Sequence, residues 1–353
     1  MAVERILIYR FGHLGDSVVA LPSFHLIARS FPNATRFVLT NVPVSAKAAP
    51  IRSILDGTGL VDGYIEYSLT ERFPGSLWKL RERIREFNPD LLIHLSFPER
   101  GMARVAGEVA FFAACGISRI IGAPYLPNLA RNQPVPGTNR WEAESVRLAR
   151  CLKSLGDSRV EDAASWDLHL SAAERGRIDS ILQEWTHGQR FIALGIGAKA
   201  DVKDWGKDNW EELVPQLWHR HQDLGLVLVG VKEETELSEQ ISRSWEGPKL
   251  NLCGRLSPRE TAAMLGRAMV FVGHDSGPMH LAAAQGTTCV AIFSAQNKPG
   301  VWFPHGLQHK VIYHRTECFG CRLDVCTYYG KKCIRSISVD EVLKAVEDVI
   351  AFS

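Results

Sequence analysis

Short apolar runs alternate with longer stretches of helical spacing along the chain, and this alternation predicts strands separated by helices. In the first half the strands are expected at Arg5–Phe11, Arg36–Thr40 and Asp90–Leu95, and the helices at Asp16–Ser30, Trp78–Phe87 and Glu142–Leu155. Strands linked by helices of this length favour parallel βαβ units with helices on both faces of the sheet.

The same alternation restarts after the polar, acidic stretch Arg159–Trp166, which is the predicted linker. Strands are then expected at Arg190–Gly195, Leu224–Gly230, Ala268–Gly273 and Thr288–Phe293, and helices at Ser171–Trp185, Glu233–Ser244, Pro278–Gln285 and Val339–Phe352. A chain of 353 residues exceeds what one core usually organises. We therefore predict two doubly wound, Rossmann-like α/β domains, residues 1–165 and 166–353, with a ligand site in an interdomain cleft at the carboxyl ends of the strands. Packing of the final helix on the first domain is left open.

Composition and charge narrow the class of protein only slightly. The chain is 46% hydrophobic and 23% charged with a net charge of +2, which is ordinary globular usage and gives no argument for a nucleic-acid partner. No apolar run reaches the roughly 18 to 20 residues of a membrane-spanning helix, and the first residues lack the features of a signal peptide. We expect a cytoplasmic protein, with peripheral contact with the inner membrane left open.

The first motif that carries chemistry is the turn Gly12–Pro22, directly after the first predicted strand. Its glycines allow a sharp turn and close approach to a ligand, and Asp16 falls at the start of the next helix on the edge expected to face the cleft. Asp16 is either a helix N-cap or a reactive carboxylate, and His13 reaches the same edge or is an ordinary turn residue. The spacing does not match the dinucleotide fingerprint, which disfavours a dehydrogenase.

Two further motifs in the second half suit a diphosphate. The loop Ile196–Trp205 follows a strand and carries Lys199 and Lys203, so that backbone N–H groups and an ammonium lie close together, although solvated surface lysines are the alternative. In Gly273–Ala284 a buried strand runs into Asp275, Ser276 and Gly277, and a helix begins at Pro278. Free N–H groups at that helix start, with His280 in the first turn, suit phosphate oxygens, and Asp275 can accept hydrogen bonds from sugar hydroxyls.

The third motif, Gly-x-Asp-Ser-Gly-x-x-His-Leu-Ala-Ala-Ala, resembles the sugar-donor signature of glycosyltransferase family 9, the lipopolysaccharide heptosyltransferases. Three weaker matches occur in the order of that family: Gly15-Asp16 with Pro22, Lys203-Asp-Trp205, and Gly230-Val-Lys-Glu233.

The resemblance implies a GT-B fold and metal-independent, inverting transfer of heptose from ADP-heptose to a lipopolysaccharide core acceptor, with no cofactor required for catalysis. It implies that Asp16 is the general base, that Lys203 contacts phosphate and Glu233 the ribose, and that the anionic acceptor glycolipid meets the first domain. The other sugar-donor contacts it implies are Asp275, Ser276, Gly277 and His280, with Lys199 close by. Candidate acceptor contacts are His13, Gly15, Arg100 and Arg104, the two arginines having a solvated helix face as their alternative.

Departures from the family pattern leave the substrates open. Gly206 replaces a proline, Ala198 and Lys199 stand where hydroxyl residues are common, and His94 stands at an often acidic position. A family member with another nucleotide sugar or a protein acceptor therefore remains an alternative, as does a non-catalytic nucleotide-sugar-binding protein.

A cysteine-rich tail adds one separate hypothesis. Cys318, Cys321, Cys326 and Cys333 begin with the chelating turn of a metal knuckle, so a structural zinc or iron site is one interpretation of this spacing. Cys115, Cys151, Cys253 and Cys289 fall in helical or strand runs and are expected in the core.

Overall fold

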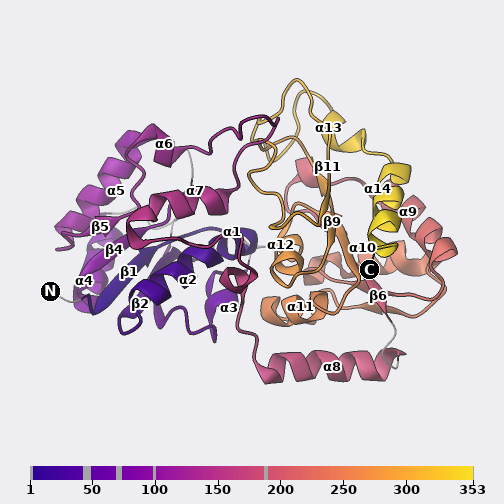
Figure 1. The fold of residues 1–353 in the computed structure, drawn as a ribbon, viewed down its shortest axis with the longest axis horizontal. Coiled ribbons are helices and arrows are strands. Elements are labelled where there is room, and N and C mark those ends of the chain that lie inside the picture. The colour runs from indigo at the N-terminus through magenta and orange to yellow at the C-terminus, as the bar shows by residue number, and fades with distance from the viewer. Residues whose placement is uncertain (1–2, 43–48, 69–73, 98–100, 187–189, 353) are drawn as a thin grey trace. The chain divides into compact units, whose positions relative to one another are not determined.

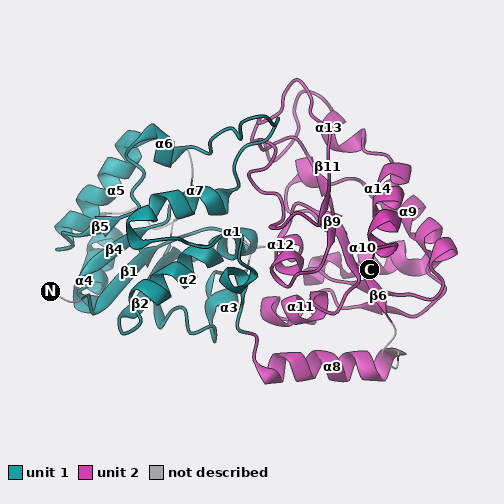
Figure 2. Cartoon of the chain, viewed as in Figure 1, with its two compact units in different colours: residues 1–169 teal, residues 170–353 magenta. Residues whose placement is uncertain are grey.

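The computed structural model describes residues 3–42, 49–68, 74–97, 101–186 and 190–352. It divides into two compact units, Met1–His169 and Leu170–Ser353 (Figure 2). The division falls four residues after the predicted boundary, because the expected linker is part of unit 1. Trp166 is buried there, and its indole N–H donates to the Val160 carbonyl at 2.8 Å.

Unit 1 is built on a parallel sheet with the strand order β3-β2-β1-β4-β5 (Figure 1). The central strand pairs Leu7 with Phe37 of β2 on one side and with Leu92 of β4 on the other. The strands are β1 (Arg5–Tyr9), β2 (Thr35–Asn41), β3 (Gly63–Tyr67), β4 (Leu91–His94) and β5 (Ile120–Ile121). The expected doubly wound topology is therefore confirmed for this unit.

The helices of unit 1 cover this sheet. Leu80 and Ile84 of α4 and Phe112 of α5 pack with Leu7 and Leu92 into one apolar cluster, which places both helices on the same face. The helices are α1 (Leu14–Val19), α2 (Leu21–Ser30), α3 (Arg52–Leu55), α4 (Pro74–Phe87), α5 (Met102–Ala114), α6 (Pro127–Ala130) and α7 (Glu144–Cys151), with short 3-10 turns η1 (Lys153–Leu155) and η2 (Ala163–Trp166).

The single helix predicted at Asp16–Ser30 is two helices, α1 and α2, that break at Ala20. Pro22 lies in the first turn of α2, where its missing N–H costs nothing, whereas the same residue inside a continuous helix would remove a hydrogen bond. The break keeps Asp16 in a short helix of its own, close to the end of β1.

Unit 2 contains a second parallel sheet, with the strand order β11-β10-β9-β6-β7-β8. Its two central strands pair in register, Leu194 with Val272 and Gly195 with Gly273. The strands are β6 (Phe191–Gly195), β7 (Gly225–Leu228), β8 (Lys249–Asn251), β9 (Val270–His274), β10 (Cys289–Phe293) and β11 (Lys310–Tyr313).

The helices of unit 2 enclose this sheet around a core in which Trp205, Trp210 and Trp245 are buried. They are α8 (Ala172–Thr186), α9 (Lys207–Arg220), α10 (Thr235–Ile241), α11 (Pro258–Leu265), α12 (Gly277–Ala284), α13 (Lys332–Arg335) and α14 (Val339–Ile350), with the 3-10 turns η3 (Asp201–Lys203), η4 (Lys232–Glu234) and η5 (Ser242–Ser244). The final helix, whose packing the sequence leaves open, lies against α9 and the strands β9 to β11 of its own unit (Figure 1).

Within the described ranges, none of the helices combines the length and the apolar character needed to cross a bilayer.

Candidate functional site

The strand order of unit 2 reverses between β6 and β9, and this is where an open α/β sheet forms a crevice for a ligand. Two of the predicted motifs leave the sheet at this point. The loop that carries Lys199 and Lys203 follows β6, and the Asp275–Gly277 turn follows β9. Sequence motifs about 70 residues apart are thus brought to one edge by adjacent strands.

Buried contacts fix the segment that carries Lys203. The backbone N–H of Trp205 donates to Nε2 of His274 at 3.1 Å, and the indole N–H of Trp205 donates to the Ile337 carbonyl at 2.8 Å. The backbone N–H of Val202 donates to the Asp324 carbonyl at 3.2 Å. The position of Lys203 is therefore determined from both sides by the core and by the loop before α13.

An ion pair joins the two motifs. Nζ of Lys203 lies 2.7 Å from Oδ2 of Asp275, and it also donates to the Asp275 backbone carbonyl at 3.4 Å. Nε2 of His280 lies 4.0 Å from Oδ1 of the same carboxylate. The Asp275 side chain is only 8% exposed, so the pair lies largely out of water.

The two histidines of this edge are held in their neutral forms. Burial lowers the pKa of His280 to about 4, although Asp275 works in the opposite direction. Burial also lowers the pKa of His274, whose Nε2 accepts from Trp205 while Nδ1 lies 3.2 Å from the Gly197 carbonyl. Because Nε2 accepts a hydrogen bond, the ring proton is on Nδ1. At neutral pH both rings therefore act as hydrogen-bonding groups without charge.

The start of α12 presents groups that suit an anion. Ser276 is its N-cap residue, and the buried Ser276 Oγ has no hydrogen-bond partner within the described residues. Pro278 occupies the first turn of the helix, where the backbone N–H groups lack partners inside the helix. An unpaired hydroxyl beside a helix N-terminus is ready to donate to a phosphate oxygen.

The two remaining sugar-donor candidates follow β6 and β7. Lys199 and Glu233 are exposed. Glu234, which the sequence does not single out, turns inward instead: its carboxylate accepts from the Val231 N–H at 3.0 Å. A Cβ atom built on Gly197 or Gly230 would come within about 2 Å of this carboxylate. The glycines of both loops thus leave room for Glu234, and only the conformation of η4 reveals that it, not Glu233, faces these loops.

The strand order of unit 1 reverses between β1 and β4, and the Asp16 turn leaves the sheet there. Oδ2 of Asp16 accepts from the His13 N–H at 2.6 Å. Gly12 has a φ of +131°, and a Cβ there would lie 2.7 Å from Oδ2 of Asp16. Gly15 and Asp16 fall in the first turn of α1, with His13 as its N-cap. Asp16 is therefore not the N-cap that the sequence allowed but the third residue of α1, and its carboxylate accepts from the backbone N–H of the N-cap residue His13.

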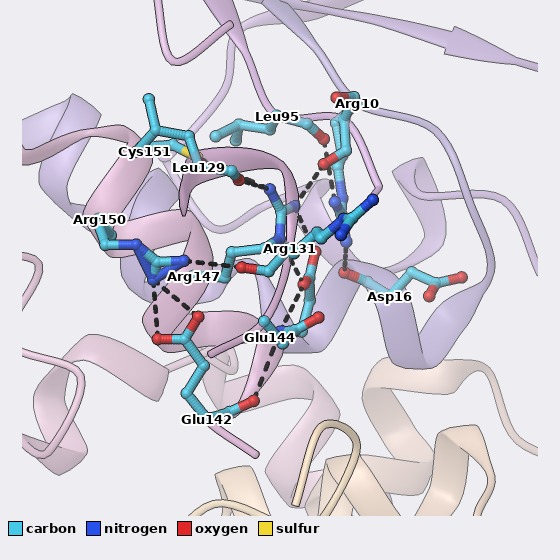
Figure 3. A network of polar contacts seen from close by, with 12 residues as sticks. Arg10, Asp16, Leu95, Leu129, Arg131, Glu142, Glu144, Arg147, Arg150 and Cys151 are labelled. Carbon is cyan, nitrogen blue, oxygen red and sulfur yellow. Dashed lines mark hydrogen bonds and ion pairs between the residues drawn. The ribbon is translucent and has the colours of Figure 1, made fainter. Parts of the chain in front are cut away.

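Behind this turn lies a buried cluster of charged side chains that the sequence gives no sign of (Figure 3). Arg10, Glu144 and Arg147 are all completely buried. Glu144 accepts from Nη2 of Arg147 at 2.6 Å and from Nε at 2.8 Å. Burial lowers the pKa of Arg10, partly offset by Asp16 and Glu144. The side chains come from the end of β1 and from α7, so the cluster ties this edge of the sheet together.

Of the two arginines predicted to contact the acceptor, the structure describes only Arg104. Arg100 lies outside the described residues. Arg104 is 67% exposed on α5, and its Nε lies 3.6 Å from Oε1 of Glu108. Glu108 also lies 3.1 Å from Nε2 of the buried His94, and it accepts from the Tyr9 hydroxyl at 3.3 Å. His94, noted as a departure from the family pattern, is therefore part of a hydrogen-bonded group at the ends of β1 and β4.

The hypothesis of a four-cysteine metal site does not fit the structure. Among the described residues, which include all four tail cysteines, no three His, Cys, Asp or Glu side chains are grouped so that they could hold a metal ion. Sγ of Cys326 instead accepts from the Lys331 N–H at 3.3 Å, and Sγ of Cys318 lies 3.5 Å from the Thr316 hydroxyl. Burial raises the pKa of the Cys333 thiol, and the nearby thiols of Cys318, Cys321 and Cys326 add to this shift, so the tail cysteines lie near one another without forming such a group. The predicted core cysteines Cys115, Cys151, Cys253 and Cys289 are buried as expected.

The chain is similar to known proteins both in sequence and in fold. The chain matches the profile of Glycosyltransferase family 9 (heptosyltransferase) over residues 152–331. It is 21% identical to lipooligosaccharide heptosyltransferase 2 of Campylobacter jejuni, covering 98% of each chain. Its fold is similar to the family 9 glycosyltransferase of Veillonella parvula (TM-score 0.71, 18% identity, 100% and 99% of the two chains). It is also similar to the ADP-heptose lipopolysaccharide heptosyltransferase II of Escherichia coli (TM-score 0.66, 18% identity, 99% of each chain).

The profile covers just over half of the chain and includes β6, β9 and the loops that carry Lys203 and Asp275. With two parallel α/β units of GT-B type, the chain belongs to glycosyltransferase family 9 and is a heptosyltransferase-like glycosyltransferase.

Proposed function

We propose that this chain transfers heptose from ADP-heptose to a hydroxyl of a lipopolysaccharide core acceptor, with inversion at the anomeric carbon and without a divalent metal. The observation that carries the proposal is the Lys203–Asp275 pair at the strand reversal of unit 2, beside the unpaired Ser276 hydroxyl at the start of α12. These groups offer what a sugar diphosphate needs: a cation, free donors and a hydroxyl-binding carboxylate.

In this proposal unit 2 binds the sugar donor. Lys203, Ser276 and the amides from Gly277 onward receive the diphosphate, and neutral His280 donates a hydrogen bond to it. Asp275 accepts from sugar hydroxyls, Glu233 or the inward Glu234 contacts the ribose, and Lys199 lies near the phosphates. Charge that develops on the leaving ADP is then stabilised by fixed donors and by the Lys203 ammonium, as a metal ion would otherwise do.

Unit 1 supplies the base. The acceptor oxygen attacks the anomeric carbon from the face opposite ADP, the new C–O bond forms as the bond to the diphosphate breaks, and the Asp16 carboxylate takes the hydroxyl proton. Gly12 leaves room for the Asp16 carboxylate in this turn, and the His13 N–H already orients that carboxylate, which suits the role of a base.

The acceptor side of the proposal is an anionic glycolipid, recognised by His13, Gly15 and the arginines after β4, in a cytoplasmic enzyme in peripheral contact with the inner membrane. Arg104 supports this assignment because it is exposed while its contact with Glu108 holds it at the edge of α5. The relatives named for lipooligosaccharide and lipopolysaccharide transfer support the same acceptor class.

The test is a transfer assay with ADP-heptose and heptose-free lipopolysaccharide as probes, with UDP- and GDP-sugars as competing donors. Wild-type protein should form product with ADP-heptose, and an excess of the chelator EDTA should change the rate by less than about twofold. Asp16→Asn should lower kcat at least about 100-fold, the usual contribution of a general base, with ADP affinity retained. Lys203→Met should weaken ADP binding about tenfold or more, as expected for a lost charge-assisted hydrogen bond.

Two matched variants control for folding. Asp90→Asn removes a carboxylate that accepts from the Arg5 N–H at the opposite end of β1, and it should leave kcat unchanged. Lys207→Met removes an exposed lysine that pairs with Glu211, and it should leave ADP affinity unchanged. Product from a UDP- or GDP-sugar alone would assign a different donor, and donor binding without any transfer would favour the non-catalytic binding protein.

A further inference from the structure

Arg10, the residue directly after β1, connects three parts of the edge that carries Asp16. Its Nη1 donates to the Leu95 carbonyl beyond β4 at 3.0 Å, and its Nη2 donates to the Asp16 carbonyl in α1 at 2.7 Å (Figure 3). Its guanidinium carbon lies over the Phe97 ring, 4.9 Å from the ring centre. One buried side chain therefore ties the ends of β1 and β4 to the Asp16 turn.

The Asp16 carbonyl is available to Arg10 because α1 is short. In a continuous helix the N–H of Ala20 would donate to this carbonyl, but here it donates to the carbonyls of Ser17 and Val18. The arginine supplies a donor that the broken helix does not. Since the Asp16 carboxylate is held by the His13 N–H, the residue is fixed through both its main chain and its side chain.

The charges of the cluster show which carboxylate balances Arg10. Glu144 makes two bonds to Arg147 and a third with Nδ2 of Asn132 at 3.3 Å. Among the described residues the buried cluster thus contains two guanidinium groups and one carboxylate. Asp16 contributes more than Glu144 to the attraction that opposes the effect of burial on Arg10. Arg10 and Asp16 are thus coupled by charge as well as by the hydrogen bond to the Asp16 carbonyl.

We propose, on the basis of the proposed function, that Arg10 is a positioning residue for the general base: it fixes the Asp16 turn without touching either substrate. The alternative is a buried arginine that only stabilises unit 1. The two differ in what removal of Arg10 does to turnover and to its pH dependence.

Among the described residues, the other charged groups of this turn and of the helices around it have partners elsewhere or lie on neighbouring elements. His13 lies on the turn itself, and Glu144 and Arg147 lie on α7. On the helices that pack against α1, His25 contacts the Asp167 carbonyl and Arg29 the Asp157 carbonyl from α2, while Arg52 of α3 pairs with Asp56 and Glu66. Arg10 is thus the buried cation bonded directly to Asp16.

The experiment compares Arg10→Lys, Arg10→Met and the control Arg147→Met in the full chain, with ADP-heptose and heptose-free lipopolysaccharide as substrates. Arg147 is as deeply buried as Arg10, but its guanidinium donates to Ser96, Leu129, Glu144 and Cys151 and not to Asp16. The readouts are kcat, the KM for ADP-heptose, the pH dependence of kcat and the thermal midpoint, with rates expressed per folded protein.

Arg10→Met should lower kcat about 100-fold, as a misplaced catalytic group does, with the KM for ADP-heptose within twofold of wild type. The acid limb of its pH dependence of kcat should move to higher pH by about one unit, because removal of the neighbouring cation makes a carboxylate easier to protonate. Arg10→Lys keeps the charge but cannot bridge both carbonyls, so kcat should fall about tenfold with the acid limb unmoved. Arg147→Met should lower the thermal midpoint and leave the acid limb at its wild-type position.

The outcomes separate this inference from the proposed function. Absence of transfer by wild-type protein overturns both. An active wild type with an Arg10→Met variant whose kcat per folded molecule and acid limb are unchanged overturns the role of Arg10 alone. If Arg10→Met does not fold, an Arg10→Lys variant with kcat within twofold of wild type is enough to overturn it.

Discussion

At the scale of single residues, the proposed sugar-donor site depends on the ion pair in unit 2. Lys203 is not a free surface cation, because Asp275 already occupies its ammonium at 2.7 Å. A diphosphate that binds there exchanges one anionic partner of Lys203 for another, so the carboxylate is released for the sugar. The pair therefore lowers the cost of burying Lys203 before the donor arrives, and it orients both side chains.

Asp275→Asn separates these two roles. The variant removes the competing anion from Lys203, so ADP should bind as tightly as to wild type or more tightly. It also removes the charged acceptor for sugar hydroxyls, so ADP-heptose should bind about tenfold more weakly than to wild type, a loss of about 1.4 kcal/mol. Isothermal calorimetry with both ligands measures this, with Lys203→Met as the comparison that weakens both. Equal weakening of ADP and ADP-heptose by Asp275→Asn would contradict the assignment.

His280 predicts an acid-sensitive step in the stability of unit 2. Its pKa in the fold is lowered to about 4, whereas the unfolded chain protonates near the ordinary histidine value of about 6.5. The unfolded state therefore binds the proton first, and stability falls as the pH drops from about 6.5 to 4, by up to about 3 kcal/mol. His280→Asn should flatten this part of the curve. Denaturant unfolding followed by tryptophan fluorescence measures it, since six of the nine tryptophans lie in unit 2. Identical curves for the two proteins in this pH range would show that His280 does not contribute.

At the scale of elements, the apolar pattern predicts the central strands well and the edges poorly. β1, β6, β9 and β10 are found where continuous apolar runs are, because a parallel strand covered on both faces needs apolar residues throughout. β8 and β11 lie at the sheet edges and begin with lysines, so their partly exposed sequences carry little signal. The break at Ala20 is signalled by Pro22 but depends on the packing of two short helices.

Within the candidate site, local motifs predict which loops matter but not which side chains meet. The Lys203–Asp275 contact spans 72 residues and follows only from the adjacency of β6 and β9. Whether Glu233 or Glu234 turns inward depends on one 3-10 turn. The contact between Arg10 and Asp16 is local in the sequence. Arg10 is held in place for it by a second hydrogen bond, to the Leu95 carbonyl, which the pairing of β1 with β4 brings alongside. For the tail cysteines, spacing alone suggests a metal site that the loop conformation does not form.

Trp205 links the core of unit 2 to its binding edge. Trp205→Phe leaves the Ile337 carbonyl without its buried donor, which should lower stability by about 1–3 kcal/mol. Because Lys203 is two residues away in the same segment, ADP should also bind about tenfold more weakly. Trp218→Phe is the control: it changes a partly buried tryptophan of the same core, whose ring lies tilted against that of Trp245, and it should leave ADP affinity unchanged. Scanning calorimetry measures the stability of each variant, and titration calorimetry measures its affinity for ADP. Equal ADP affinity for the two variants would show that Trp205 does not determine the position of Lys203.

At the scale of the whole molecule, the proposed chemistry is divided between two units that each have their own sheet and core. The proposed base is on unit 1 and the proposed phosphate-binding edge on unit 2, each at the reversal of its strand order. We therefore expect a ligand that contacts only one of these edges to stabilise the unit that carries it.

Hydrogen exchange on the full chain with ADP alone checks this division. At 100 times its Kd, ADP should stabilise the unit that binds it by about 2.7 kcal/mol. Peptides covering residues 191–205 and 270–284 should exchange more slowly, because they contain the ends of β6 and β9 and the start of α12. Peptides covering residues 5–22 should exchange as in the free protein, because their hydrogen bonds belong to the sheet and helices of unit 1. Heptose-free lipopolysaccharide should produce the opposite pattern. Strong protection of residues 5–22 by ADP would place nucleotide contacts on unit 1 and reverse the assignment of base and phosphate edges.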